Sequence, residues 1–388
     1  MEGSFMRTAI QGLARRAATP WGVTILFAAA WLAVAVPSLP SSPLIGPDMS
    51  VIIGNLRADH SAAAVWSWFS GHWAQGEEYY RPIPSVLHWA DYMIWGAAPY
   101  GWRLTNALLL AATFPALTWL CARGFERPWA GPVTAMALLR FHPAEEMPIW
   151  PAWRTDLVCG LFLLLTTGAA LEYIRDGAWK RLLLALGMLL LALMSKEVAI
   201  VWPAVAAIAV LLMGRNRHGL ILLGSSFALT GAFWLLRVHL LGPPLLGQLP
   251  PQVNFPMETQ LAFFYRTLVD PLYINFTVIY PSIAGEPGWW ISALLWQAAL
   301  EDTAFVAANV ILAVGAPRLL AVLWAWRVIT YLPAVPFVRL YPFYYYIPAL
   351  GSALIYGLAA VCLVQMLLPR LMKSRQDGSQ SDNATEDH

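Results

Sequence analysis

The run LLLALGMLLLALMSKEVAIVWPAVAAIAVLLM, residues 182–213, is apolar throughout except at Ser195, Lys196 and Glu197. A membrane-spanning helix needs about 20 apolar residues, so this run predicts two crossings joined by a polar turn. Ionisable side chains at such a depth are costly and are functional by default. We therefore treat Lys196 as a candidate ligand of an anionic lipid phosphate, oriented by Glu197. The alternative is a simple polar turn between two helices.

The composition of the whole chain agrees with a membrane protein. Of its 388 residues, 59% are hydrophobic and 12% are charged, whereas soluble proteins carry about a quarter charged residues. The net charge of +2 is not gathered into a basic stripe, which argues against nucleic-acid binding. The three cysteines lie in separate apolar segments and indicate neither a disulfide nor a zinc site.

The expected fold is an all-α integral membrane protein with about ten transmembrane helices. The first apolar segment follows Arg7, Arg15 and Arg16 and resembles a secretory signal, but no small-residue cleavage site follows, which favours an uncleaved helix. Residues 261–280 contain Arg266, Asp270 and Pro271 and are expected to form a re-entrant or surface-lying helix. The ten predicted spans are 21–36, 104–121, 128–139, 157–170, 182–194, 198–213, 220–241, 305–316, 319–336 and 347–368.

The distribution of Lys and Arg orients these spans, because short cytoplasmic loops are enriched in both. It predicts that both termini are cytoplasmic, in a multi-pass protein expected in a bacterial inner membrane. A single membrane domain, residues 1–370, would then be followed by a disordered tail, 371–388, rich in Ser, Asp and Gln. The first outer loop would span about residues 38–103 and contain short interfacial helices.

This first outer loop is rich in aromatic residues and holds the first candidate for chemistry. A long loop in a compact protein is usually functional or disordered, and the many Trp and Tyr residues argue against disorder. Asp48 follows the first span directly. A carboxylate at the membrane surface can act as a general base or hold a metal ion. The alternative is an ordinary loop acid or a helix cap.

Residues 142–156, HPAEEMPIWPAWRTD, form a second polar interruption. Their prolines and acids predict irregular backbone, which a membrane protein tolerates where it lines a cavity or packs against protein. The planar guanidinium of Arg154 suits a phosphate, and the alternative is an ion pair with Asp156 or a glutamate. On the same predicted side, Arg339 precedes several tyrosines. It is a further candidate cation, although the tyrosines alone would make an interfacial belt.

Four motifs, in order along the chain, resemble the polytopic glycosyltransferase C superfamily, in particular protein O-mannosyltransferases and the related transmembrane O-mannosyltransferases with tetratricopeptide repeats, without the repeat domain. The similarity covers roughly residues 20–350. The motifs are Asp48 with Asn55; Tyr80-Arg81-Pro82-Ile83-Pro84 leading through Gly96 and Pro99 to Leu104-Thr105-Asn106; His142-Pro143 with Glu146, Trp150, Arg154 and Asp156; and Ser195-Lys196-Glu197 with Pro203.

The resemblance implies an inverting transfer of a sugar from a polyprenyl-phosphate donor on the non-cytoplasmic side. It implies that Asp48 is the base for the acceptor, which would be a glycan, a lipid or a protein, or that it holds a divalent cation. Arg154, Lys196 and Arg339 would bind the donor phosphate. Supporting roles would fall to Glu146, Asp156, Glu197, Arg81 and Asn55.

Two other classes of function stay open from the sequence. A transporter or flippase of lipid-linked intermediates would favour polar groups on both sides of the membrane, whereas the unusual charges here gather on one predicted side. A non-catalytic membrane subunit that retains the fold is the second alternative. It is favoured by Met49, which stands where members of the family often have a second acid.

Overall fold

The computed structural model describes residues 18–44, 47–71, 79–141, 144, 146–213, 216–242, 288–334 and 342–383. Within these ranges the secondary structure is entirely helical. Five helices are long and apolar enough to cross a membrane, and two shorter apolar helices accompany them. The prediction of an all-α integral membrane protein is confirmed, while the count of ten crossings stays a prediction. The five are Pro20–Ser38, Pro99–Gly124, Pro151–Asp176, Arg217–Leu241 and Tyr346–Leu368; the shorter two are Glu197–Leu212 and Thr303–Gly315.

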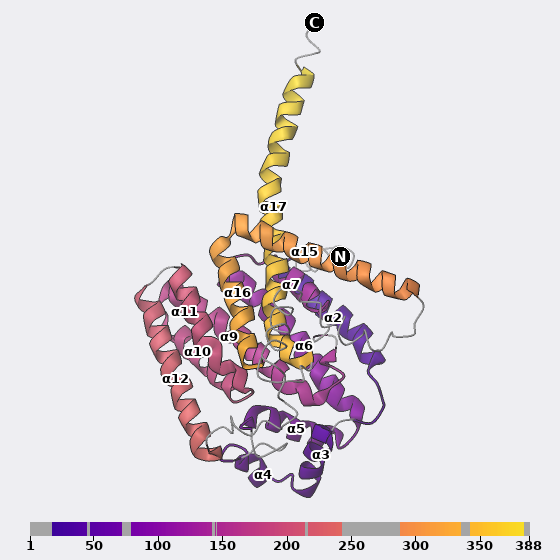
Figure 1. Cartoon of the computed structure of the whole chain (residues 1–388), viewed down its shortest axis with the longest axis vertical. Helices are drawn as coiled ribbons and strands as arrows, with labels where there is room; N and C mark the ends of the chain where they lie inside the picture. Colours follow the sequence, from indigo (N-terminus) through magenta and orange to yellow (C-terminus); the bar gives the residue numbers. More distant parts are fainter. Residues whose placement is uncertain are drawn as a thin grey trace, which may run out of the picture.

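Short helices close one end of the bundle. Helices α3 (Pro47–Ala58), α4 (Ala62–Ser67) and α5 (Pro82–Trp95) lie at the bottom of Figure 1, opposite the protruding end of α17 (Tyr346–Asn383). We call the end formed by α3, α4 and α5 the outer end. They pack around a small apolar core to which the start of the next helix also contributes, so the described part of the first outer loop is folded, as its aromatic content predicts. This core consists of Met49, Ile52, Leu56, Trp68 and Trp102.

The polar turn at Ser195 to Glu197 lies at the outer end, as expected from the run that surrounds it. Helix α9 (Arg154–Asp176) leads away from the outer end, and α10 (Trp179–Leu193) returns beside it. A short 3-10 helix, Glu197–Val201, then leads into α11 (Trp202–Met213). We call the opposite end, where α9 turns into α10, the inner end. Gly177 makes that turn with a φ of +69°, a conformation that favours glycine.

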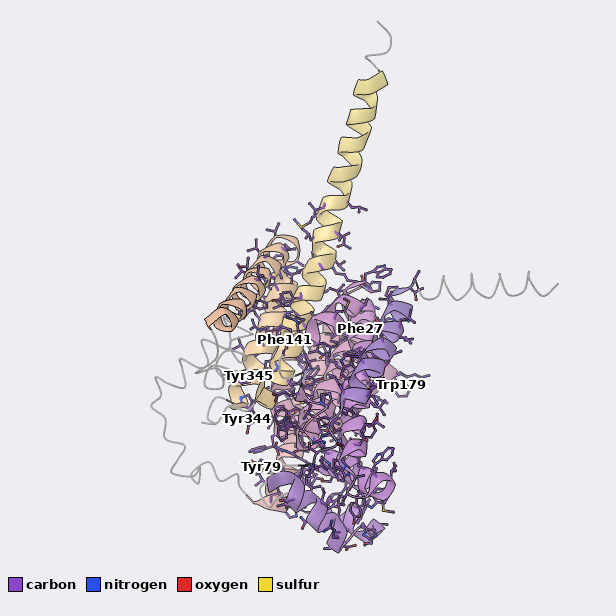
Figure 2. The ribbon with its side chains drawn as sticks, turned by 90° about the vertical axis from the view of Figure 1, so that its right-hand side faces the viewer. Phe27, Tyr79, Phe141, Trp179, Tyr344 and Tyr345 are labelled. Carbon is purple, nitrogen blue, oxygen red and sulfur yellow. The ribbon has the colours of Figure 1, made fainter. Side chains whose placement is uncertain are left out.

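The remaining helices wrap this central group. Helix α2 (Pro20–Ser38) packs on α6 (Pro99–Trp119), with the hydroxyls of Thr24 and Thr118 hydrogen-bonded at 2.7 Å. Helices α12 (Arg217–Leu241), α15 (Gly288–Gly315) and α16 (Pro317–Tyr331) complete the bundle. Aromatic side chains are distributed over its length, and Trp179, 63% exposed, projects away from it (Figure 2). Such a side chain suits the membrane interface.

Two predicted segments differ from the structure. The span predicted at 128–139 is the nine-residue helix α7 (Ala130–Leu138), which at 1.5 Å per residue extends about 14 Å, so the helix alone is shorter than a full span. It packs closely on α17: a Cβ on Gly357 would lie 2.6 Å from the Ala130 carbonyl oxygen.

The second difference is the predicted disordered tail. Helix α17 continues to Asn383, beyond the predicted boundary at residue 371. Good helix formers such as Leu371, Met372, Lys373 and Arg375 follow the span directly, and they favour continuation of a helix that is already nucleated. The segment 261–280 and Arg339 lie outside the described residues.

Candidate functional site

Lys196 and Asp156 form a buried ion pair at the outer end. The Lys196 ammonium donates to both carboxylate oxygens of Asp156, each at 2.6 Å. The two side chains are 8% and 2% exposed. Asp156 lies in the first turn of α9, and Lys196 is the extended residue that caps the 3-10 helix after α10. The pair therefore links two motifs that lie 40 residues apart in the sequence.

Arg81 and Glu197 form a second ion pair beside the first. The Arg81 Nε donates to both oxygens of Glu197 at 3.1 Å, and its Nη2 donates to Oε2 at 2.6 Å. A backbone hydrogen bond connects the same two segments, because the Ile83 amide donates to the Met194 carbonyl at 3.3 Å. Glu197 thus forms an ion pair with Arg81, and its predicted role in orienting Lys196 stays a prediction. The arrangement is bidentate, the geometry that a guanidinium favours.

The two ion pairs belong to one electrostatic group. Burial opposes the charge on Arg81, but the Glu197 carboxylate, with help from Tyr79 and Asp156, outweighs it and raises the pKa of Arg81. Burial lowers the pKa of Lys196, against the opposing effect of Asp156. Each cation also lies near an aromatic ring: Arg81 is 4.2 Å from the centroid of Tyr79, and Lys196 is 5.0 Å from that of Tyr344. We call Arg81, Asp156, Lys196 and Glu197 the charge quartet.

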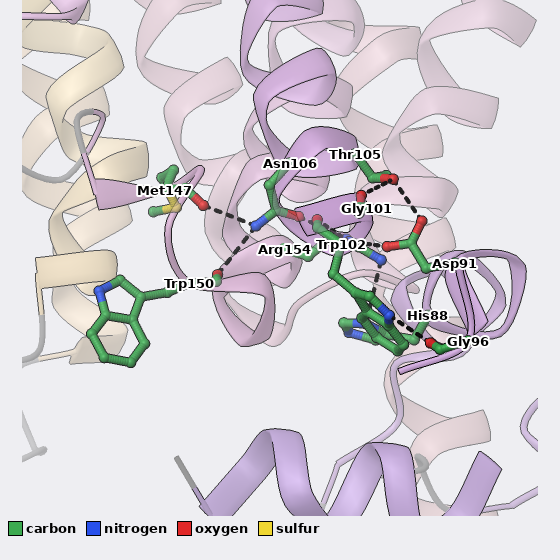
Figure 3. Close-up of polar contacts among 10 residues, drawn as sticks. All are labelled: His88, Asp91, Gly96, Gly101, Trp102, Thr105, Asn106, Met147, Trp150 and Arg154. Carbon is green, nitrogen blue, oxygen red and sulfur yellow. Dashed lines mark hydrogen bonds and ion pairs between the residues drawn. The ribbon is translucent and has the colours of Figure 1, made fainter. Parts of the chain in front are cut away.

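Arg154 occupies a separate, fully buried network, shown in Figure 3. Its guanidinium is paired with the carboxylate of Asp91 on α5. It also donates to the Asn106 side-chain oxygen at 2.8 Å and to the Trp102 carbonyl at 3.1 Å. The His88 Nδ1 lies 3.4 Å from the Arg154 Nη1, and the His88 ring stacks on Trp102. The partner of Arg154 is therefore Asp91, a residue that the sequence analysis did not single out.

The partners of Arg154 extend the network in two directions. Thr105 donates to Asp91 at 2.6 Å, and Asn106 donates to the carbonyls of Met147 and Trp150 at 2.8 and 3.1 Å. The network consequently fixes α5, α6 and the start of α9 relative to one another and anchors the irregular segment before α9. Asp156 follows Arg154 by two residues, so this network also sets the position of the charge quartet.

The electrostatics of the Arg154 network reflect its burial. Burial lowers the pKa of His88 well below its usual value of 6.5, and the nearby Arg154 charge lowers it further, so the imidazole is neutral at pH 7. Burial raises the pKa of Asp91, and this effect is opposed by Arg154 and Thr105. One sequence signal was available: His88 and Asp91 lie three residues apart on α5, a spacing that places them on the same helix face.

The other predicted site residues are less defined. Asp48 is the second residue of α3, at the outer end, and its side chain lies outside the described residues, as does Arg339. Asn55 is exposed on α3, and Glu146 is half-buried in the segment before α9. Within the described residues, no group of three or more His, Cys, Asp or Glu side chains is placed to hold a metal ion. The roles predicted for these residues stay predictions.

The comparisons with known proteins bear on the fold. No family model matches the chain, and no curated protein matches it. Among solved structures, the chain is similar to ArnT from Cupriavidus metallidurans bound to undecaprenyl phosphate, with a TM-score of 0.52 and 18% sequence identity. The match covers 87% of this chain and 60% of ArnT, so the chain spans less than two thirds of the length of that protein. At this identity the likeness concerns the fold.

Proposed function

We propose that this protein is a membrane glycosyltransferase that moves a sugar from a polyprenyl-phosphate donor to an acceptor on the non-cytoplasmic side, with inversion. One observation carries the proposal. Two cations from distant segments, Arg81 and Lys196, meet at the outer end, where Asp48 lies in the first turn of α3. They do so in a fold similar to that of ArnT, which was solved with undecaprenyl phosphate bound.

The geometry of the outer end suits such a donor. A polyprenyl phosphate keeps its tail in the lipid and presents its phosphate at the membrane surface, so its protein ligands must lie near the ends of spanning helices. Lys196 and Asp156 lie at the ends of α10 and α9 that face the short helices α3 to α5. Both cations are largely shielded from solvent, which strengthens their interaction with an anion.

In the proposed reaction, Asp48 accepts the proton of an acceptor hydroxyl. The acceptor oxygen attacks the anomeric carbon from the face opposite the phosphate, and the bond between that carbon and the phosphate oxygen breaks. The phosphate leaves with the electron pair of that bond. Lys196 and Arg81 stabilise the negative charge that develops on it. Arg339 is a further candidate for this phosphate, and a divalent cation held by Asp48 is the alternative role of that acid.

We assign Arg154 a positioning role in this scheme. Its guanidinium already donates hydrogen bonds to Asp91, Asn106 and the Trp102 carbonyl, and the side chain is fully buried. Binding a phosphate there would leave Asp91 as a buried charge without its counterion, which is costly. Arg154 instead holds the start of α9, and with it Asp156, against α5.

The test is sugar transfer from a radiolabelled polyprenyl-phosphate sugar in proteoliposomes. Asp48→Asn removes the proposed base and is expected to slow transfer by about 100-fold or more. Asp59→Asn is the matched control, an exposed acid in the same outer loop, and is expected to leave the rate unchanged. An unaltered rate in Asp48→Asn would overturn the role of that acid. No transfer by the unmodified protein with any donor would favour a flippase or a non-catalytic subunit.

A further inference from the structure

The charge quartet is neutral as it stands. The Lys196 ammonium and the Arg81 guanidinium are matched by the carboxylates of Asp156 and Glu197. A negatively charged phosphate entering this group therefore meets cations that already have counterions, and it also meets two like charges. Like charges placed side by side repel strongly in a desolvated site. Binding consequently requires a rearrangement within the charge quartet.

The Lys196 ammonium is the group whose partner conflicts most directly with a phosphate. Both oxygens of Asp156 lie 2.6 Å from its Nζ, the separation that a bound phosphate oxygen would also adopt. Asp156 is nearly inaccessible to solvent and is held by a hydrogen bond from the Thr155 hydroxyl at 3.2 Å. A phosphate that binds Lys196 thus competes with Asp156 for the same donors.

Arg81 can offset the charge of Asp156 when Asp156 releases Lys196. Lys196 and Glu197 are neighbours in the chain, so the two ion pairs lie side by side, and the charge of Arg81 also acts on the Asp156 carboxylate. Asp156 would therefore not become an isolated buried charge on releasing Lys196, because Arg81 lies close enough to stabilise it. Without this second cation the release would carry the large cost of an uncompensated buried carboxylate.

We infer that Asp156 is a competing counterion that sets the affinity of the protein for a lipid-linked phosphate. The phosphate binds Lys196 in exchange for Asp156, whose charge is then offset in part by Arg81, which Asp156 shares with Glu197. This inference rests on the proposed function for the identity of the ligand. It adds that the site is closed by its own ion pair in the absence of ligand, and that a carboxylate controls how tightly the phosphate binds.

A different role for Asp156 predicts a change in phosphate affinity of the opposite sign. If the carboxylate only orients the ammonium toward the phosphate, its removal weakens binding. If it competes, its removal strengthens binding. The sign of the change in affinity therefore decides between the two, and a purely structural role gives a loss of folded protein instead.

The experiment measures binding of undecaprenyl phosphate to the full chain in lipid nanodiscs, with the unfolding temperature of each variant as a check on folding. Asp156→Asn is expected to tighten binding by about ten-fold, and Lys196→Met to weaken it by at least as much. The double variant should match Lys196→Met, because the gain requires the freed ammonium. Asp59→Asn is the control, an exposed acid of the outer loop that lies outside the charge quartet, and it is expected to leave binding unchanged. Unchanged or weaker binding by folded Asp156→Asn would overturn the inference.

A second measurement uses the unmodified protein and does not depend on the folding of any variant. With carbon-13-labelled aspartate, the infrared carboxylate band is expected to shift when undecaprenyl phosphate is added, as Asp156 exchanges its partner. An unchanged band at saturating lipid would overturn the exchange. Inorganic phosphate is the second probe, and the same shift at the same concentration would overturn the assignment to a lipid-linked group.

These outcomes are separate from those of the proposed function. Tighter binding by Asp156→Asn in a protein that transfers no sugar would support the exchange and count against the transferase. Normal transfer by the unmodified protein, with no gain of affinity in Asp156→Asn, would support the transferase and count against the exchange.

Discussion

The two ends of the bundle carry ion pairs of different kinds. At the outer end, Arg154 and Asp91 are 0% and 3% exposed. At the inner end, Arg175 pairs with Glu126, and these side chains are 38% and 74% exposed. Arg181, 36% exposed, also pairs at the inner end with Asp176 and with the buried Glu172. Among the described residues, the outer-end pairs Arg154–Asp91 and Lys196–Asp156 bury both partners, whereas each inner-end pair has a partner that is at least 36% exposed.

This difference teaches that charge serves two purposes in one membrane protein. Exposed Lys and Arg residues at the inner end fit the enrichment that orients a chain in the membrane, and each such pair contributes little to stability. Buried pairs at the outer end are costly to desolvate and are retained where a fixed geometry is needed. The charge quartet and the Arg154 network contain such buried pairs. We therefore place the candidate site at the outer end.

The largest expected effect concerns the side of the membrane on which each end lies. Asp59→Cys at the outer end is expected to react fully with a membrane-impermeant maleimide applied to intact cells, and Glu126→Cys at the inner end only after permeabilisation. The three native cysteines are buried, so they contribute little background. Labelling of both positions in intact cells, or the reverse pattern, would break the assignment of outer and inner ends.

The next effect is on stability. Arg154→Met leaves Asp91 as an uncompensated buried carboxylate and is expected to lower the free energy of unfolding by about 3 to 5 kcal/mol. The measurement is unfolding in mixed micelles with increasing denaturing detergent. Adding Asp91→Asn to Arg154→Met should recover part of the loss, because the stranded charge is then removed. A cost no larger than that of an exposed pair would contradict the burial of this network.

The effect of pH follows from His88. Its pKa is depressed in the folded state, so the unfolded chain takes up a proton first as the pH falls below 6.5. The stability that this neutral histidine contributes is complete above pH 6.5 and is lost at about 1.4 kcal/mol per pH unit as the pH falls further. His88→Asn keeps an acceptor for Arg154 and should flatten this slope between pH 6.5 and 5. Parallel curves for the two proteins would show that His88 does not titrate differently on folding.

The smallest effect is expected at the inner end. Arg175→Met breaks an exposed pair and should change the free energy of unfolding by less than about 1 kcal/mol, measured in the same micelles as Arg154→Met. A change as large as that at Arg154 would remove the distinction between the two ends.

Much of this architecture follows from local sequence. The spans predicted at 21–36 and 220–241 correspond to α2 and α12 within a few residues, because runs of apolar residues are a strong local signal. The interruption at Lys196 was also visible, since its depth in an apolar run marks it as unusual. These features depend only on neighbouring residues in the chain.

The partners of the charged residues did not follow from sequence. Arg154 was expected to meet a phosphate, Asp156 or a glutamate, yet it meets Asp91, 63 residues away on a helix of the outer loop. Glu197 is adjacent to Lys196 in the chain but forms its ion pair with Arg81. Burial of a charge can be read from its apolar surroundings, but the choice of counterion depends on how distant helices meet. That information lies in the tertiary packing.

The most direct test of the account is sugar transfer in proteoliposomes by two variants that each remove one cation. Lys196→Met takes a cation from the charge quartet and is expected to slow transfer by about 100-fold. Arg181→Met takes one from the inner end and is expected to leave the rate within about two-fold, since exposed pairs contribute little. Equal rates for Lys196→Met and the unmodified protein would contradict the claim that the buried charges of the outer end form the working site.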